Sequence, residues 1–137
     1  MNKTSLFIFI FCISLISFTN AEDNYYYQNG KKIYLKPSSA IQTFSLSDKS
    51  LLKTKSYTQL ENNTPIQITN QILLQTNNDI VTIVEKYPIT LLKTITSNIY
   101  LVEVDTNQSV LSIANRLYED KNILFAHPNT IKKIENR

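Results

Sequence analysis

The sequence predicts an α+β domain, in which a β-hairpin and an irregular β-rich arm precede a β-α-β-β-α-β series. Near residue 30, an Asn-Gly pair lies between two runs of β-forming residues. This pair favours the type I′ turn of a hairpin, because both central residues need positive φ. Further along, two segments with apolar residues at helical spacing are each flanked by short apolar runs. With 137 residues, 42% of them apolar, the chain has the size and composition of one folded domain.

Residues 1–21 have the pattern of a secretory signal peptide. Lys3 precedes an apolar run from Leu6 to Phe18, and the small residues Thr19 and Ala21 suit cleavage after Ala21. The apolar run is too short for a membrane span, although an uncleaved anchor is the alternative. We therefore expect export to the periplasm or the extracellular space, and no membrane association after cleavage.

The composition excludes most enzyme classes. The chain holds one glycine, one histidine and one cysteine, and the cysteine lies in the leader. One histidine (His127) cannot build a histidine metal centre, and one glycine (Gly30) excludes the phosphate-binding and dinucleotide-binding glycine motifs. We expect no catalytic residues, no cofactor and no metal. Loss of Lys3 leaves 13 of the 14 basic residues against 11 acidic ones, so the net charge falls from +3 to +2, which argues against a nucleic-acid partner.

The first elements after the leader are a hairpin and an arm. Tyr25 to Leu35 should form the hairpin, and Pro37 should end it. The arm, residues 40–69, has no regular pattern beyond three short apolar runs. These runs predict short strands at 41–46, 57–60 and 66–68, with a turn at 62–65 between the last two.

The remaining elements repeat one order twice within 70–128. The first unit is a strand at 72–76, a helix ended by Pro88 and a strand at 89–95; the second is a strand at 99–104, a helix and a strand at 123–126. Two such units joined by the tight turn Ser97-Asn98 predict the ferredoxin-like split βαβ arrangement, an antiparallel sheet with both helices on one side. The helical stripes are Ile80, Ile83, Val84 and Tyr87, and Val110, Ile113, Ala114, Leu117 and Tyr118.

The strands of this sheet do not alternate between apolar and polar residues. Neighbouring apolar residues occur at Leu91 and Leu92, at Tyr100 and Leu101, and at Leu124 and Phe125. Because neighbours on a strand point to opposite faces, the face without helices should also carry apolar side chains. Two interpretations remain open: this face is an interaction surface, or the arm folds back over it.

Two segments resemble the propeptide of subtilisin-like serine proteases. They are the helix end Asn115-Arg116-Leu117-Tyr118-Glu119 and the run from Ile123 to Asn129, which ends in Ala126-His127-Pro128-Asn129. The hairpin is also similar to the start of propeptides in many secreted bacterial members. No catalytic domain follows Arg137, so the resemblance implies a free-standing inhibitor and folding chaperone that acts in trans on a secreted, kexin-like or other subtilisin-like protease. A periplasmic protein-binding adaptor and a non-functional fragment of a protease precursor are the alternatives.

The resemblance also implies contact residues. In the family, the open sheet face packs on two helices of the protease, acidic side chains cap those helices, and the tail enters the substrate cleft. The acidic positions of the family fall near His127 and Asn129 here, which removes the charge. The expected sheet interface is Leu92, Ile99, Leu101, Glu103 and Leu124; the expected capping residues are Glu103, Asp105, His127 and Asn129; the expected cleft-inserting tail, within residues 129–137, is Ile131, Lys132, Lys133, Ile134, Glu135, Asn136 and Arg137.

Overall fold

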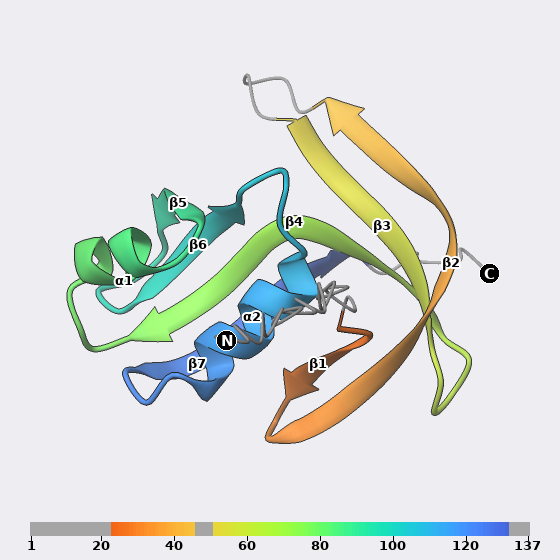
Figure 1. The fold of residues 1–137 in the computed structure, drawn as a ribbon, viewed down its shortest axis with the longest axis horizontal. Coiled ribbons are helices and arrows are strands. Elements are labelled where there is room, and N and C mark those ends of the chain that lie inside the picture. Colours follow the sequence, from red (N-terminus) through yellow and green to blue (C-terminus); the bar gives the residue numbers. More distant parts are fainter. Residues whose placement is uncertain (1–22, 46–50, 132–137) are drawn as a thin grey trace, which may run out of the picture.

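The computed structural model describes residues 23–45 and 51–131 (Figure 1). The predicted signal peptide and the tail residues 132–137 lie outside the described residues. Within them the protein is an α+β fold with a seven-stranded sheet and two helices. The elements are β1 (Tyr25–Gln28), β2 (Lys31–Ser45), β3 (Leu51–Gln59), β4 (Pro65–Thr76), α1 (Ile80–Lys86), β5 (Ile89–Thr94), β6 (Ile99–Val104), α2 (Val110–Glu119) and β7 (Ile123–Ile131).

The N-terminal hairpin is confirmed. β1 pairs with β2 in antiparallel register, with Gln28 opposite Lys31. Asn29 and Gly30 both have positive φ, at 50° and 75°, as a type I′ turn requires. Pro37 does not end the second strand as expected, because β2 continues to Ser45 with a register irregularity after Pro37. An irregularity of this kind accommodates a residue that cannot donate a ladder hydrogen bond.

The arm is more regular than its sequence suggests. β2, β3 and β4 form a long antiparallel meander, and the strands expected at 66–68 and 72–76 are one continuous strand that crosses residue 70. The polar residues between the apolar runs are part of the strands because they pair with residues of the neighbouring strand. Thr54 of β3, for example, is paired with Thr69 of β4. The predicted turn lies between β3 and β4, where the Asn62 side chain accepts a hydrogen bond from the amide of Thr64 at 3.0 Å.

β4 is the strand that joins the two parts of the sheet. Ile68 is paired with Lys55 of β3 and with Thr130 of β7, and Ile72 is paired with Val102 of β6 and with Pro128 of β7. β3 and β6 therefore follow one another along one edge of β4, while β7 occupies the other edge. β5 pairs with the far side of β6, and every pairing is antiparallel.

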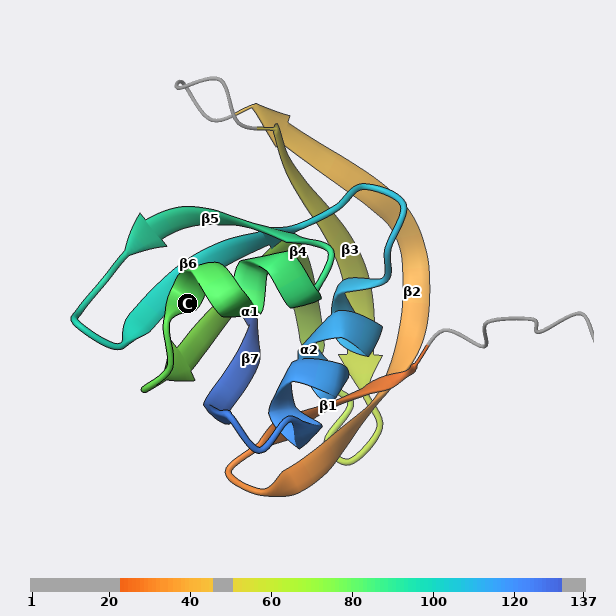
Figure 2. The same ribbon diagram turned by 60° about the vertical axis from the view of Figure 1, so that its left-hand side comes forward.

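Both helices pack against one face of this sheet (Figure 2). Each begins at a side-chain cap: Asp79 accepts a hydrogen bond from the amide of Val81, and Ser109 accepts one from the amide of Ser112. The main core lies between the helices and β4 to β7. Its buried members are Ile72, Leu74, Ile83, Tyr87, Ile89, Val102, Val104, Ile113, Ala114, Leu117, Ile123 and Ala126.

A second core lies where β1, β2 and β3 curve toward the start of α2 (Figures 1 and 2). It contains Tyr26, Leu35, Tyr57, Ile66 and Ile68, together with Leu111 of α2, which is completely buried. The side chain of Asn115 on α2 also donates to the carbonyl oxygen of Tyr25 at 2.9 Å. One helix therefore contributes to both cores and holds the hairpin to the rest of the domain.

The carboxylate of Asp120 ties the ends of the two helices together. It accepts hydrogen bonds from Lys86 Nζ at 2.8 Å, from the Tyr87 hydroxyl at 2.6 Å and from the amide of Asn122 at 2.9 Å. These bonds hold the pKa of Asp120 well below its usual range, and burial together with the same carboxylate raises the pKa of Tyr87 to about 12.

We expect Asp120→Asn to lower the free energy of unfolding by about 1–3 kcal/mol, because the amide cannot accept all three hydrogen bonds. The native carboxyl has a lower pKa than the unfolded one, so its contribution is present above the unfolded pKa of about 4 and is lost as the pH falls below it. Urea denaturation at pH 7 measures the change. Lys121→Gln, an exposed neighbour, is the control, and equal stability of the two variants would contradict the prediction.

Candidate functional site

The face of the sheet opposite the helices is the candidate site. Residues directly opposite each other in antiparallel strands share a face, so the register assigns this face in rows. One row is Leu101–Leu73–His127 and the next is Ile99–Gln75–Phe125, each across β6, β4 and β7. We call these two rows and the polar residues beside them, Glu103, Gln71 and Asn129, the open sheet face.

The two apolar rows are only partly covered. Leu73, Leu101, Ile99, Phe125 and His127 are all half-buried, whereas the residues between them on the same strands belong to the main core. Among the described residues, no helix packs on this face. The described apolar side chains of the arm, such as Tyr57 and Ile66, pack on the helix side instead. The described part of the arm therefore extends the sheet rather than folding over its open face.

A polar row borders the apolar rows. Glu103 of β6 is paired with Gln71 of β4, and Asn129 of β7 donates its amide to the Gln71 side chain at 3.1 Å. The Asn70 side chain donates to Glu103 Oε1 at 2.7 Å. The carboxylate of Glu103 is thereby fixed at the border of an apolar surface, with Gln71 between it and Asn129. Among the described residues, it is the carboxylate that the register places at this end of the open sheet face.

Two of the expected interface residues, Leu92 and Leu124, are not paired in these rows. Leu92 falls at a register irregularity between Leu91 and Lys93, and Leu124 at another between Ile123 and Phe125, so neither has a partner in the rows. Their side chains are 39% and 55% exposed. The alternation rule fails here because a bulge adds a residue to one strand. Phe125 and Leu73 lie in the rows instead. Leu73 is the middle residue of the apolar triplet Ile72-Leu73-Leu74, which was the sequence signal for its position.

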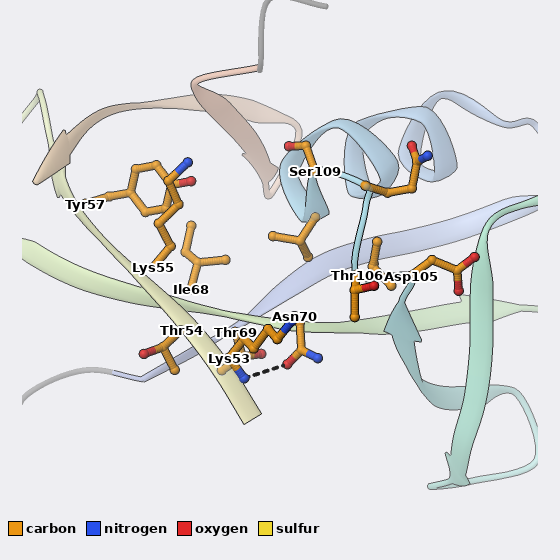
Figure 3. Close-up of a pocket in the computed structure, with 13 residues that line it drawn as sticks. Lys53, Thr54, Lys55, Tyr57, Ile68, Thr69, Asn70, Asp105, Thr106 and Ser109 are labelled. Atoms are coloured by element: carbon orange, nitrogen blue, oxygen red, sulfur yellow. Dashed lines mark hydrogen bonds between the residues drawn. The ribbon is translucent and has the colours of Figure 1, made fainter. Parts of the chain in front are cut away.

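Asp105, an expected capping residue, lies beyond the end of β6 and outside the rows of the open sheet face. It follows β6 and lines a cavity of about 160 Å³ on the helix side, between β3, β4 and the start of α2. Figure 3 shows Lys55 and Tyr57 on one side of this cavity and Asp105 and Thr106 on the other. Asp105 also lines a surface pocket together with Glu103 and Thr90, so it lies at the end of β6 between the two faces. Of the expected capping residues, Glu103, His127 and Asn129 share one face.

His127 is held between aromatic rings at the junction of the hairpin and β7. Its ring centroid lies 5.1 Å from that of Tyr26 and 6.3 Å from that of Phe125. Its Nδ1 lies 2.7 Å from the carbonyl oxygen of Pro128. Burial lowers the pKa of His127, and the contact with the carbonyl oxygen opposes this shift. The ring is therefore neutral at pH 7 and belongs to the apolar row.

We expect the domain to lose stability as the pH falls from about 7.5 to 5, because unfolded His127 with a pKa of about 6.5 binds a proton more readily than native His127 does. His127→Phe should reduce this loss. Chemical denaturation at both pH values measures it, and the histidine ring protons give the native pKa directly, since the chain has one histidine. A native pKa above that of an unfolded peptide would reverse the expected sign.

The last described residue of the expected tail is Ile131, which ends β7 opposite Gln67 and is 37% exposed. The other tail residues, 132–137, are not among the described residues. Within residues 23–45 and 51–131, no group of three acidic, histidine or cysteine residues could hold a metal ion. Nor does any helix in this part of the chain have the length and apolar character needed to cross a membrane.

Comparison with protein-family models, with curated proteins and with solved structures finds no match to this chain.

Proposed function

We propose that the chain is an exported, propeptide-like protein that binds a subtilisin-like serine protease in trans through its open sheet face. The observation that carries this proposal is an apolar sheet surface, bordered by a fixed carboxylate, on which no helix packs in the part of the chain that the structure describes. The strand order β7-β4-β6-β5, antiparallel throughout and with both helices on one face, supports a ferredoxin-like arrangement as the scaffold. Neither proposed role, folding assistance nor inhibition, requires a catalytic residue in this chain.

The geometry of the open sheet face suits a pair of helices. Rows of Leu, Ile and Phe side chains across three strands can pack against apolar helix sides. Glu103 at the border can meet a helix N-terminus, where a carboxylate accepts hydrogen bonds from free amides and faces the positive end of the dipole. Asn129, across Gln71 on β7, can also accept such bonds, although without charge. Glu103 is thus the proposed charged cap, and Asp105, which lines a surface pocket together with Glu103, stays a second candidate.

Binding to the native protease is sufficient for folding assistance. A partner that binds the native form and not the unfolded chain shifts the folding equilibrium in favour of the native form. Inhibition requires a second contact, in which residues after Ile131 extend into the substrate cleft. The tail contains Lys132, Lys133 and Arg137, whose charge suits the specificity pocket of a kexin-like protease. The adaptor function remains the alternative, because an apolar sheet face by itself does not select a partner class.

We expect Leu101→Asp to weaken binding to the protease by about tenfold or more, because a charge without a partner would be buried in the interface. Val81→Asp is the matched control, since Val81 is 57% exposed on α1, on the helix side. Binding is measured by calorimetry with the catalytic domain of a subtilisin-like protease, and circular dichroism confirms folding of both variants. If the two variants bind equally, the open sheet face is not the docking surface.

We expect deletion of residues 132–137 to abolish inhibition while the truncated protein still binds the protease and raises its refolding yield. The deletion leaves β7 complete, so the sheet should be unchanged. Arg137→Ala alone should raise the inhibition constant. Peptidase assays and refolding yields measure the two activities separately. Inhibition by the truncated protein equal to that by the full chain would show that the tail does not enter the cleft.

A further inference from the structure

The outer face of the hairpin carries a cluster of aromatic rings separate from the open sheet face. The register places Tyr25 opposite Tyr34, and Tyr27 opposite Lys32. Tyr26 and Ile33, which alternate with them, point to the other face and belong to the second core. The tyrosines on the outer face are therefore not part of the second core, and packing in that core does not explain their arrangement.

Two of these rings lie perpendicular to each other, and both are close to the ammonium group of Lys32. The rings of Tyr25 and Tyr27 have centroids 5.8 Å apart and an interplanar angle of 88°. Lys32 Nζ lies 4.5 Å from the centroid of Tyr25 and 5.7 Å from that of Tyr27. Both distances are within the range of a cation–π interaction, in which the negative ring face attracts the cation.

The ring of Tyr27 is held in place by residues of α2. The ring of Tyr118 stacks on Tyr27 with centroids 4.1 Å apart and an interplanar angle of 9°. The hydroxyl of Tyr27 donates to Glu119 Oε1 at 3.1 Å. Tyr27 is thus fixed by a ring on one side and by a carboxylate at its hydroxyl, so the space between Tyr25 and Tyr27 is shaped before any ligand binds.

A carboxylate also lies beside the rings, because Glu119 accepts the hydrogen bond of the Tyr27 hydroxyl. Burial raises the pKa of Tyr25 and that of Tyr27. The tyrosines of the cluster are therefore neutral at pH 7 and lie beside one ammonium group, that of Lys32.

We propose that the rings of Tyr25 and Tyr27, the latter held by Tyr118 and Glu119, form a binding site for an alkylammonium group, and that Lys32 occupies this site in the isolated chain. Perpendicular aromatic faces around a cation are the arrangement by which proteins recognise ammonium and quaternary ammonium groups. The same chemistry occurs in a lysine side chain of a partner and in a choline-type head group. A ligand must displace Lys32, so the apparent affinity is reduced by the fraction of sites that Lys32 fills.

The test compares the unaltered chain with Lys32→Ala, using choline and its uncharged isostere 3,3-dimethylbutan-1-ol as probes. Binding is followed by nuclear magnetic resonance of the tyrosine ring protons. Lys32→Ala should bind choline at least about tenfold more tightly than the unaltered chain does, and should prefer choline to the alcohol. Lys31→Ala is the matched control. Lys31 is paired with Glu61 at 2.9 Å, so its removal should leave choline binding as in the unaltered chain.

Butylammonium, which mimics the lysine side chain, distinguishes the two sources of the ligand. Preference for butylammonium supports a partner's lysine, and preference for choline supports a quaternary head group. The proposal is overturned if Lys32→Ala binds choline no better than the alcohol, or if Tyr25→Leu in the Lys32→Ala background retains choline binding. Should that double variant not fold, the ring signals of Lys32→Ala decide: choline must shift those of Tyr25 and Tyr27 and leave those of Tyr100 unchanged.

Discussion

The pairing of β4 with three other strands is the constraint on which the structure depends. Its first half pairs with β3 and its second half with β6, while β7 lies along its other edge. Ile72 and Leu74 on this strand are completely buried under the helices, and Ile68 is buried in the second core. A shift of β4 by one residue would exchange its buried and half-buried sides, so its register fixes the open sheet face at the same time as the core.

The functional proposal follows from the unequal covering of the two sheet faces. Helices α1 and α2 both pack on one side, so Leu73 and Leu101 remain half-buried on the other side although their neighbours on the strand are buried. Contiguous apolar surface that the fold leaves partly uncovered is typical of interaction sites, and the proposal rests on this. The tyrosine cluster of the hairpin is a second surface, because its Tyr27 ring is fixed by Tyr118 and Glu119 of α2 and not by the open sheet face.

Much of the fold could be predicted because its signals are local. The positive φ of Asn29 and Gly30 follows from their residue types, because glycine has no Cβ and asparagine tolerates the left-handed region. Both helical stripes have the expected spacing. The candidate site was predicted less well. The expected interface included Ile99, Leu101 and Glu103, and these residues share one face because they lie in a regular strand. It also included Leu92 and Leu124, which lie at bulges for which the sequence has no signal.

The sequence by itself determined the turns, the helices and the alternation of the regular strands, because each of these depends on residues that are close together in the chain. Only the tertiary structure decided that the polar segments of the arm join the sheet, because a strand rich in Thr and Lys is stabilised by the strands paired with it. The tertiary structure also decided the surroundings of Glu103 and Asp105, two residues apart in the chain. β6 ends between them, so Glu103 is paired with Gln71 at the border of the open sheet face, while Asp105 follows the strand and lines the cavity beside α2.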